Sequence, residues 1–389
     1  MVKKVSSNES LTFIGRVTYR RGPFYDVEDG SRVIQLFLTP SEQKKYRDRI
    51  KSGAIIKVEG TLGMSKTNRV FLRPNEIELL AHPKIPFRHM SSDDAEQFVT
   101  ATFNRSRRKK LFQSNELVEI VRKFFWEQGF LEVYTPCFHR FPYGLNVSQF
   151  SIADTDYLLR PDHDIDTRAY LLFQQRVFQT GPVFRKMGVS QRYDQEFLVG
   201  NFFAWMEDYI DAARRCLDLF KTLKDAGFPI PEEINVLNFS QAVNGRQGDK
   251  IKYSNLEESI NSSCNNLPAE DLSEHRDVFR KKVKKSFKEL TIIIGAPGII
   301  NPTAKKIENV PYVEDFQIVW KGRTIFHGCT EENDPIKLGH LSGNAFKKYR
   351  SLLEYGIPPY SSVGLSIYSL VQCITGEKKV TDLFPSLLK

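Results

Sequence analysis

The chain has 389 residues, of which 41% are hydrophobic and 26% charged, and a formal net charge of +9. Domains average roughly 150 residues, so this length predicts two or three of them, and the hydrophobic and aromatic content excludes a disordered chain. No apolar run approaches the roughly 18 residues of a transmembrane helix, and the first residues lack the apolar core of a secretory signal. We therefore expect no membrane partner and no secretion.

Cysteine and histidine spacing excludes two kinds of stabilised fold. The five cysteines are scattered without a CxxC pair, and the seven histidines form no HExxH grouping. Neither a disulfide framework nor a zinc site built from these residues is predicted. Reduced cysteines are typical of intracellular proteins, so the cytoplasm is the expected location.

The basic excess belongs to the N-terminal part of the chain. Residues 1–110 contain 22 Lys and Arg against 12 Asp and Glu, whereas residues 111–389 contain 34 against 35. The excess includes the run RSRRKK at 105–110. Such a segment favours a nucleic-acid partner over a membrane, because no amphipathic anchor accompanies it. A solvated basic face that binds nothing is the alternative.

Residues 11–80 have the pattern of a small barrel. Strand-like runs at 11–19, 32–38, 54–62 and 69–80 are separated by turn signals, and a short helix is predicted over 41–53. We therefore predict a five-stranded OB barrel in residues 1–85, a fold that stacks bases on aromatic rings along a charged groove. The expected nucleic-acid contacts are Phe13, Arg20, Arg21, Phe24, Phe37 and Phe71. Tyr25 is a further aromatic candidate, and about half of these aromatic rings must lie in the barrel core because strand residues alternate between faces.

The rest of the chain predicts a linker and an α+β domain. Residues 86–110 are the expected basic linker, and apolar residues at 117, 120, 121, 124 and 125 predict a helix that Gly129 ends. Strands are predicted at 130–134, 176–185 and 196–205, and an amphipathic helix from Glu207. Residues 225–290 are polar and predict an inserted helical subdomain, after which strands return. Strands in blocks with helices around them favour an α+β domain at 111–389, and no phosphate-binding glycine loop occurs.

Seven blocks of the second domain follow one another along the chain. They are VRKFFWEQGFLEVYTP (121–136), FRKM with GVSQRYDQEF (184–197), NPTAKK (301–306), VEDFQIVW (313–320), TEENDP (330–335), LEYGIPP (353–359) and GLSIYS (364–369). In these blocks and their order, the chain resembles the class II aminoacyl-tRNA synthetases that carry an N-terminal anticodon-binding OB barrel, and among them the lysyl-tRNA synthetases most closely. The resemblance implies an antiparallel-sheet catalytic domain.

The resemblance implies a site for ATP and Mg²⁺. Arg185 is similar to the arginine that contacts the α-phosphate, and Phe197 to the aromatic ring under adenine. Glu331 is similar to an acidic residue on the metal side, and Arg192 lies in the loop that reaches toward the outer phosphates. Arg185 and Glu331 are thus the implied catalytic residues, and Glu331 is the implied metal ligand. The chemistry suits these types, because guanidinium groups match phosphate oxygens and carboxylates bind Mg²⁺.

Four positions depart from the family pattern. Met187 replaces the glutamate that accepts from the adenine amino group, and Tyr193 replaces a histidine. Asn201 replaces an acidic residue, and Ser369, after Tyr368, replaces the arginine that covers adenine and contacts the γ-phosphate. Serine has neither the charge nor the planar surface of arginine, so a damaged nucleotide site is expected unless a neighbouring Lys or Arg takes over.

Other positions have both a structural and a functional interpretation. Pro136 ends the motif 1 strand, which in the family forms a homodimer interface. Asp162 and His163 lie near the place of an amino-acid-binding carboxylate, and a surface loop is the alternative. Phe202 and Trp205 are expected in the core.

Three functions agree with this sequence. The first is a lysyl-tRNA synthetase paralogue that activates an amino acid with ATP, with reduced activity, and transfers it to tRNA or another acceptor. The second is a catalytically silent synthetase-like protein that binds tRNA or regulates. The third is an ATP-dependent amino-acid ligase that does not use tRNA. The retained Arg185, Phe197 and Glu331 favour a nucleotide site, and the barrel favours tRNA.

Overall fold

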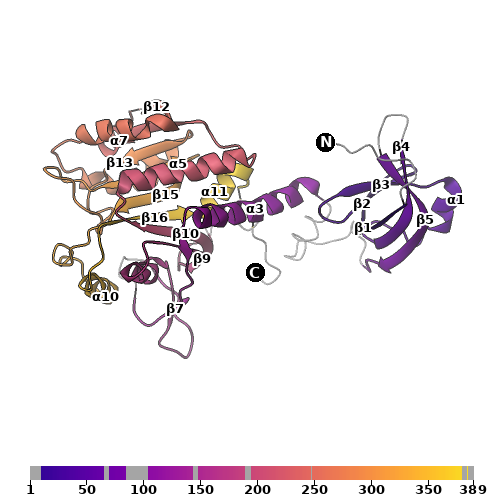
Figure 1. Ribbon diagram of the computed structural model, residues 1–389, viewed down its shortest axis with the longest axis horizontal. Helices are drawn as coiled ribbons and strands as arrows, with labels where there is room; N and C mark the ends of the chain where they lie inside the picture. Colours follow the sequence, from indigo (N-terminus) through magenta and orange to yellow (C-terminus); the bar gives the residue numbers. More distant parts are fainter. Residues whose placement is uncertain are drawn as a thin grey trace. The chain divides into compact units, whose positions relative to one another are not determined.

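The structure is a computed structural model that describes residues 10–64, 70–84, 104–142, 148–188, 194–246, 248–378 and 383. The chain divides into two compact units between Arg108 and Lys109, and each is described by itself. Figure 1 follows both units from the indigo N-terminal strands to the yellow C-terminal helix.

The first unit contains a closed five-stranded barrel. Its order around the barrel is β1-β2-β3-β5-β4. Helix α1 (Pro40–Lys45) lies between β3 and β4 in the chain, and a capping box between Thr39 and Glu42 starts it. The predicted OB barrel is confirmed. The strands are β1 (Ser10–Arg21), β2 (Phe24–Glu28), β3 (Val33–Phe37), β4 (Ile55–Met64) and β5 (Val70–Ala81).

Strand alternation decides which aromatic rings fill the barrel. Phe13 and Tyr25 are only 5% and 3% exposed and belong to the barrel core. The prediction that Phe13 contacts nucleic acid is therefore wrong, because its side chain points inward while its neighbour Ile14 faces solvent. Phe24 alternates with Tyr25 and is half-buried.

The second unit is built on a nine-stranded sheet with the order β12-β11-β13-β14-β15-β16-β10-β9-β6. Neighbouring strands are antiparallel except in the pairs β11–β13 and β6–β9, so the predicted α+β class is confirmed. The strands are β6 (Leu131–Glu132), β9 (Arg176–Phe184), β10 (Glu196–Trp205), β11 (Glu233–Asn238), β12 (Asp249–Lys252), β13 (Thr291–Ile294), β14 (Asp315–Trp320), β15 (Arg323–Thr330) and β16 (Tyr360–Ser366).

One face of this sheet is covered by helices. Helices α3 (Arg105–Glu127), α5 (Tyr209–Asp225), α7 (Leu256–Asn265) and α11 (Ile367–Thr375) share one core cluster with the sheet (Figure 1). The predicted apolar stripe of α3 lies in this core, and Gly129 follows the helix with a φ of 76°, which suits glycine. Phe202 is buried there as predicted. Trp205 is half-buried against a cluster that includes α10 (Asn344–Leu353).

Two sequence-based boundaries are corrected. The basic run at 105–110 forms the first turns of α3 and is not part of an extended linker; residues 86–103 lie outside the described part of the chain. The insertion over 225–290 is only partly helical, because β11 and β12 extend the large sheet. Six-residue β11 is an inner strand between β12 and β13, which explains why it buries Ile234 and Val236 within a polar stretch.

Short elements complete the second unit. Some of them contribute residues to the wall of the site described below. Among the described residues, no helix is long and apolar enough to cross a membrane. The short elements are β7 (Phe138–His139), β8 (Leu158–Leu159), α4 (Asp164–Arg168), η2 (Ala169–Leu172), α6 (Phe239–Val243), η3 (Tyr253–Asn255), η4 (Ser273–His275), α8 (Arg276–Val278), the π-helical turn η5 (Phe279–Val283) and α9 (Lys284–Ser286).

Candidate functional site

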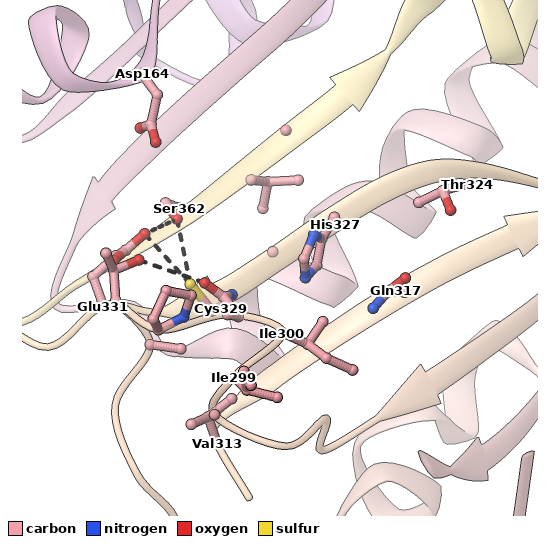
Figure 2. A pocket seen from close by; sticks show the side chains of 18 of the residues that line it. Asp164, Ile299, Ile300, Val313, Gln317, Thr324, His327, Cys329, Glu331 and Ser362 are labelled. Carbon is pink, nitrogen blue, oxygen red and sulfur yellow. Dashed lines mark hydrogen bonds between the residues drawn. The ribbon is translucent and has the colours of Figure 1, made fainter. Parts of the chain in front are cut away.

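A cavity of about 2170 Å³ lies on the face of the sheet away from the helical core. Strand β10 shows how the chain builds it, because Phe197, Val199, Asn201 and Phe203 line the cavity while Phe202 points to the helices. Strands β15 and β16, helix α4, segment 276–285 and the loop 298–314 supply the rest of the wall. Figure 2 shows Glu331 and Ser362 at one end of the view and Gln317 and Thr324 at the other.

A buried ion-pair cluster closes the Glu331 end. The Arg168 guanidinium donates to both oxygens of Asp164, at 2.6 and 2.8 Å, and to Glu331 Oε1 at 2.6 Å. Glu331 Oε1 also accepts from Ser362 Oγ at 2.5 Å. Arg168 and Glu331 are 5% and 1% exposed. Two carboxylates around one guanidinium compensate the charge that burial would otherwise penalise.

This environment does not fit the implied metal role of Glu331. A cation at Glu331 would meet the fixed positive charge of Arg168, 2.6 Å from Oε1. The second oxygen, Oε2, is buried and has no hydrogen-bond partner among the described residues, so the contacts of the cluster are all made by Oε1. Among the described residues, no group of three or more His, Cys, Asp or Glu side chains is arranged to hold a metal ion. The metal assignment of Glu331 is therefore corrected: its carboxylate is a structural partner of Arg168.

Arg185 lies on the cavity wall at the end of the β9 strand. Its Nε donates to the Pro161 carbonyl at 2.9 Å and its Nη2 to Asp162 Oδ2 at 3.1 Å. The guanidinium carbon lies 5.2 Å from the ring centroid of Phe197. The two residues implied for the α-phosphate and for adenine are thus in direct contact. Arg185 keeps donors toward the cavity, because its side chain is 34% exposed.

Asp162 links Arg185 to the floor of the site. Its Oδ1 accepts from Asn201 Nδ2 at 3.1 Å, so Asn201 serves as a neutral donor where the family pattern has an acid. His163 is fully buried, which corrects the surface-loop alternative, and burial lowers its pKa to about 4 and keeps it neutral. Asp162 lines the cavity, and so does Asp164, an acidic residue that the sequence did not single out.

The family comparison adds an identity to this geometry. Residues 92–387 match the family described as tRNA synthetases class II (D, K and N). The chain belongs to this family. Residues 11–80 match the OB-fold nucleic acid binding domain. The predicted resemblance is therefore confirmed.

Curated relatives extend along almost all of this synthetase-family chain. The lysine--tRNA ligase of Teredinibacter turnerae is 25% identical over 430 aligned positions, covering 97% of this chain and 86% of the relative. Those of Helicobacter pylori and Shewanella amazonensis are also 25% identical, over 97% and 96% of this chain and 86% of each relative.

The positions that depart from the class II synthetase pattern lie at the cavity. Met187 and Ser369 both line it. Ser369, at the start of α11, accepts a hydrogen bond at 2.8 Å from Ser366 Oγ, the helix-capping hydroxyl. Arg192 and Tyr193 lie outside the described residues.

A lysine that the sequence analysis did not single out lies at the other end of the synthetase cavity. Lys284 donates from Nζ to Gln317 Oε1 at 3.1 Å and to Thr324 Oγ1 at 3.2 Å. Burial lowers its pKa to about 8, and the nearby Arg280 charge acts in the same direction. Its neighbours in the sequence are KKVKK at 281–285, so no sequence signal distinguishes it from a solvated lysine.

The barrel carries an aromatic surface of its own. Phe24, Phe37 and Phe71 are half-buried, with ring centroids 5.3 to 6.5 Å apart. The Arg73 guanidinium lies 5.7 Å from the Phe37 ring and 6.0 Å from the Phe71 ring. Of the other expected contacts, Arg20 and Arg21 are exposed. This barrel surface of three phenylalanines and Arg73 has the chemistry that stacks nucleic-acid bases.

Proposed function

We propose that this protein activates an amino acid with ATP and transfers it to tRNA, the activity for which its relatives, the lysine--tRNA ligases, are named. One observation carries the proposal: Arg185 and Phe197, both in the block 184–197 that resembles the family, lie together on the wall of the cavity. In the activation step, a carboxylate oxygen of the amino acid attacks the α-phosphate, the α–β P–O bond breaks, and pyrophosphate leaves. Arg185 would stabilise the charge that builds up on the α-phosphate oxygens.

The amino acid has a defined place beside this arginine. Asp162 and Asp164 line the same wall, and their side chains are 24% and 25% exposed, so an ammonium group can approach each carboxylate beside its arginine partner. Arg168 and Glu331 hold Asp164 in position from behind through the buried cluster. We assign Asp162 and Asp164 as the acceptors for the substrate amine, and Arg168 as a positioning residue.

The tRNA part of the proposal rests on the barrel. Phe24, Phe37 and Phe71 with Arg73 form a stacking surface in a segment that also has a basic excess. A ligase that uses a small acceptor has no need of such a surface, which supports tRNA as the acceptor.

A catalytically silent tRNA-binding protein is the second candidate function. Met187 and Ser369 favour it, because neither supplies the adenine acceptor or the cation of the family pattern at a cavity-lining position. Amino-acid-dependent exchange of pyrophosphate into ATP, measured across the twenty amino acids, separates the two functions. Exchange that Arg185→Ala abolishes supports activation. Absent exchange together with salt-sensitive tRNA binding supports the silent protein.

We further propose a cytoplasmic homodimer. The motif 1 region exposes large apolar side chains, and Arg122 connects two of them by donating to Tyr134 Oη at 2.7 Å while lying 5.5 Å from the Trp126 ring. Exposed apolar surface of this kind marks an interface, and Pro136 lies within it. All five cysteines are free, which suits a reducing compartment. Sedimentation as a single 44.9 kDa species at micromolar concentration would contradict the proposed dimer. The exposed apolar residues are Phe112, Trp126, Leu131, Tyr134 and Phe138.

A further inference from the structure

Five acidic side chains of the cavity wall are paired with basic partners. Carboxylates with a free oxygen face are what Mg²⁺ requires, and a guanidinium or ammonium at ion-pair distance competes for the same oxygens. Mg²⁺ therefore does not fit these five carboxylates. The pairs are Asp162–Arg185, Asp164–Arg168, Glu331–Arg168, Glu332–Lys337 and Glu314–Lys305.

Lys284 is placed in the opposite way. Both of its side-chain partners, Gln317 of β14 and Thr324 of β15, are neutral, so they hold the ammonium without cancelling its charge. The Phe279 ring, whose centroid lies 5.5 Å from Lys284 Nζ, is also neutral. Lys284 makes no ion pair with the described residues, and it lines the cavity.

The wall around Lys284 is basic. Among the residues of segments 271–285 and 322–325 that line the cavity, Asp271 is the single acidic one. A cavity wall with this surplus raises the local concentration of anions, and an ammonium held by neutral partners is a natural ligand for phosphate oxygens. The basic lining residues of these segments are Arg276, Arg280, Lys284, Lys285 and Arg323.

We propose that Lys284, rather than a divalent metal, is the cation that holds the outer phosphates of the nucleotide. The inference rests on the proposed ATP site. The two ends of one nucleotide would then be divided between residues of two regions. Arg185 and Phe197 bind the α-phosphate and the base, and Lys284 binds the terminal phosphates.

The test is ATP binding by the full-length protein, measured by isothermal titration calorimetry once in EDTA and once in Mg²⁺. We expect binding in EDTA to be within about threefold of that in Mg²⁺. Lys284→Gln should weaken ATP binding in EDTA at least tenfold, and Lys284→Arg should retain it. AMP has no outer phosphates, so its affinity should be the same for the native protein and Lys284→Gln, which separates a phosphate contact from a folding defect.

The same segment provides a matched control. Lys282 is exposed and does not line the cavity, so Lys282→Gln should leave ATP binding unchanged. ATP binding that requires Mg²⁺, or that Lys284→Gln leaves intact, would overturn the inference while the proposed function stands. Absence of both ATP and AMP binding from the folded native protein would instead overturn the proposed nucleotide site, and the inference with it.

Discussion

The two ends of the cavity treat charge in opposite ways. At one end, Arg168 lies between Asp164 and Glu331, and the three charges are compensated within the chain. At the other end, Lys284 has two neutral hydrogen-bond partners and keeps its charge available. A compensated ion-pair cluster stabilises the shape of a site, whereas a cation without an acidic partner can bind an anionic ligand. The comparison separates a structural end from the end that we propose to bind phosphate.

The barrel repeats the second pattern on a smaller scale. Arg73 lies over the rings of Phe37 and Phe71, and it makes no ion pair with the described residues. Its charge is therefore available to an RNA backbone while the rings are available to bases. Cations with neutral partners thus mark both surfaces that we assign to anionic ligands.

The largest expected effect is at the compensated end. Arg168→Ala removes the cation between two buried carboxylates, and should lower the free energy of unfolding by about 3–5 kcal/mol. Urea denaturation measures this loss. The matched control is Arg214→Ala, because Arg214 pairs with Asp211 and Glu257 at the surface, where about 1 kcal/mol or less is expected. Equal small losses for the two variants would show that the Arg168 cluster is not a structural element.

The next effect concerns the arginine that stands between the two ends. Arg185→Ala should weaken ATP binding by about 2–3 kcal/mol, since a charge-assisted contact to phosphate is lost. Arg176→Ala is the control on the same strand, because Arg176 pairs with Glu207 and does not line the cavity. Titration calorimetry compares the three proteins. Native affinity in Arg185→Ala would remove Arg185 from the nucleotide site and leave Lys284 as its main cation.

The barrel surface should show a smaller effect on RNA. Phe71→Ala should weaken tRNA binding by about 1–2 kcal/mol, because one base loses its stacking partner. Gly63 leaves space for this ring, since a Cβ at position 63 would lie 2.7 Å from Phe71 Cζ. Phe13→Ala should act instead on the stability of the barrel, because Phe13 is core. Fluorescence anisotropy with labelled tRNA and thermal unfolding distinguish the two. A loss of stability for Phe71→Ala equal to that of Phe13→Ala would contradict the surface assignment.

Sequence periodicity and local motifs carried a large part of the fold. The strand pattern of 11–80, the stripe from Leu117 to Phe125 and the β9–β10 pair all depend on residues close in the chain, and they were predicted. The family resemblance of the block 184–197 implied that Arg185 and Phe197 belong to one site, and both residues line the cavity. Alternation alone did not place Phe13, because it predicts two faces without saying which one is inside.

The missed residues all depend on contacts between distant positions. Arg168 and Glu331 are 163 positions apart, so their pairing has no local signature, and Glu331 was interpreted as a free metal ligand. Lys284 is one of four lysines in KKVKK, and only its placement across β14 and β15 selects it. Tertiary contacts, rather than residue type, determine whether such a charge is compensated.

The smallest expected effect is a pH dependence at the uncompensated end. The pKa of Lys284 is lowered to about 8, so the ammonium is present at pH 7 and mostly deprotonated at pH 9. ATP affinity in EDTA should therefore fall by up to about tenfold between these pH values, and Lys284→Arg should remove the fall because guanidinium stays charged. The charged groups near Lys284 are Arg280 and Lys285 on its own segment, Asp315 on β14, and Arg323 and His327 on β15. Asp315 contacts His327 at 3.2 Å, and its negative charge acts to raise the pKa of Lys284, against the larger effect of burial. A profile that is flat in the native protein, or that persists in Lys284→Arg, would mean that another group titrates and that the two ends of the cavity do not differ as we infer.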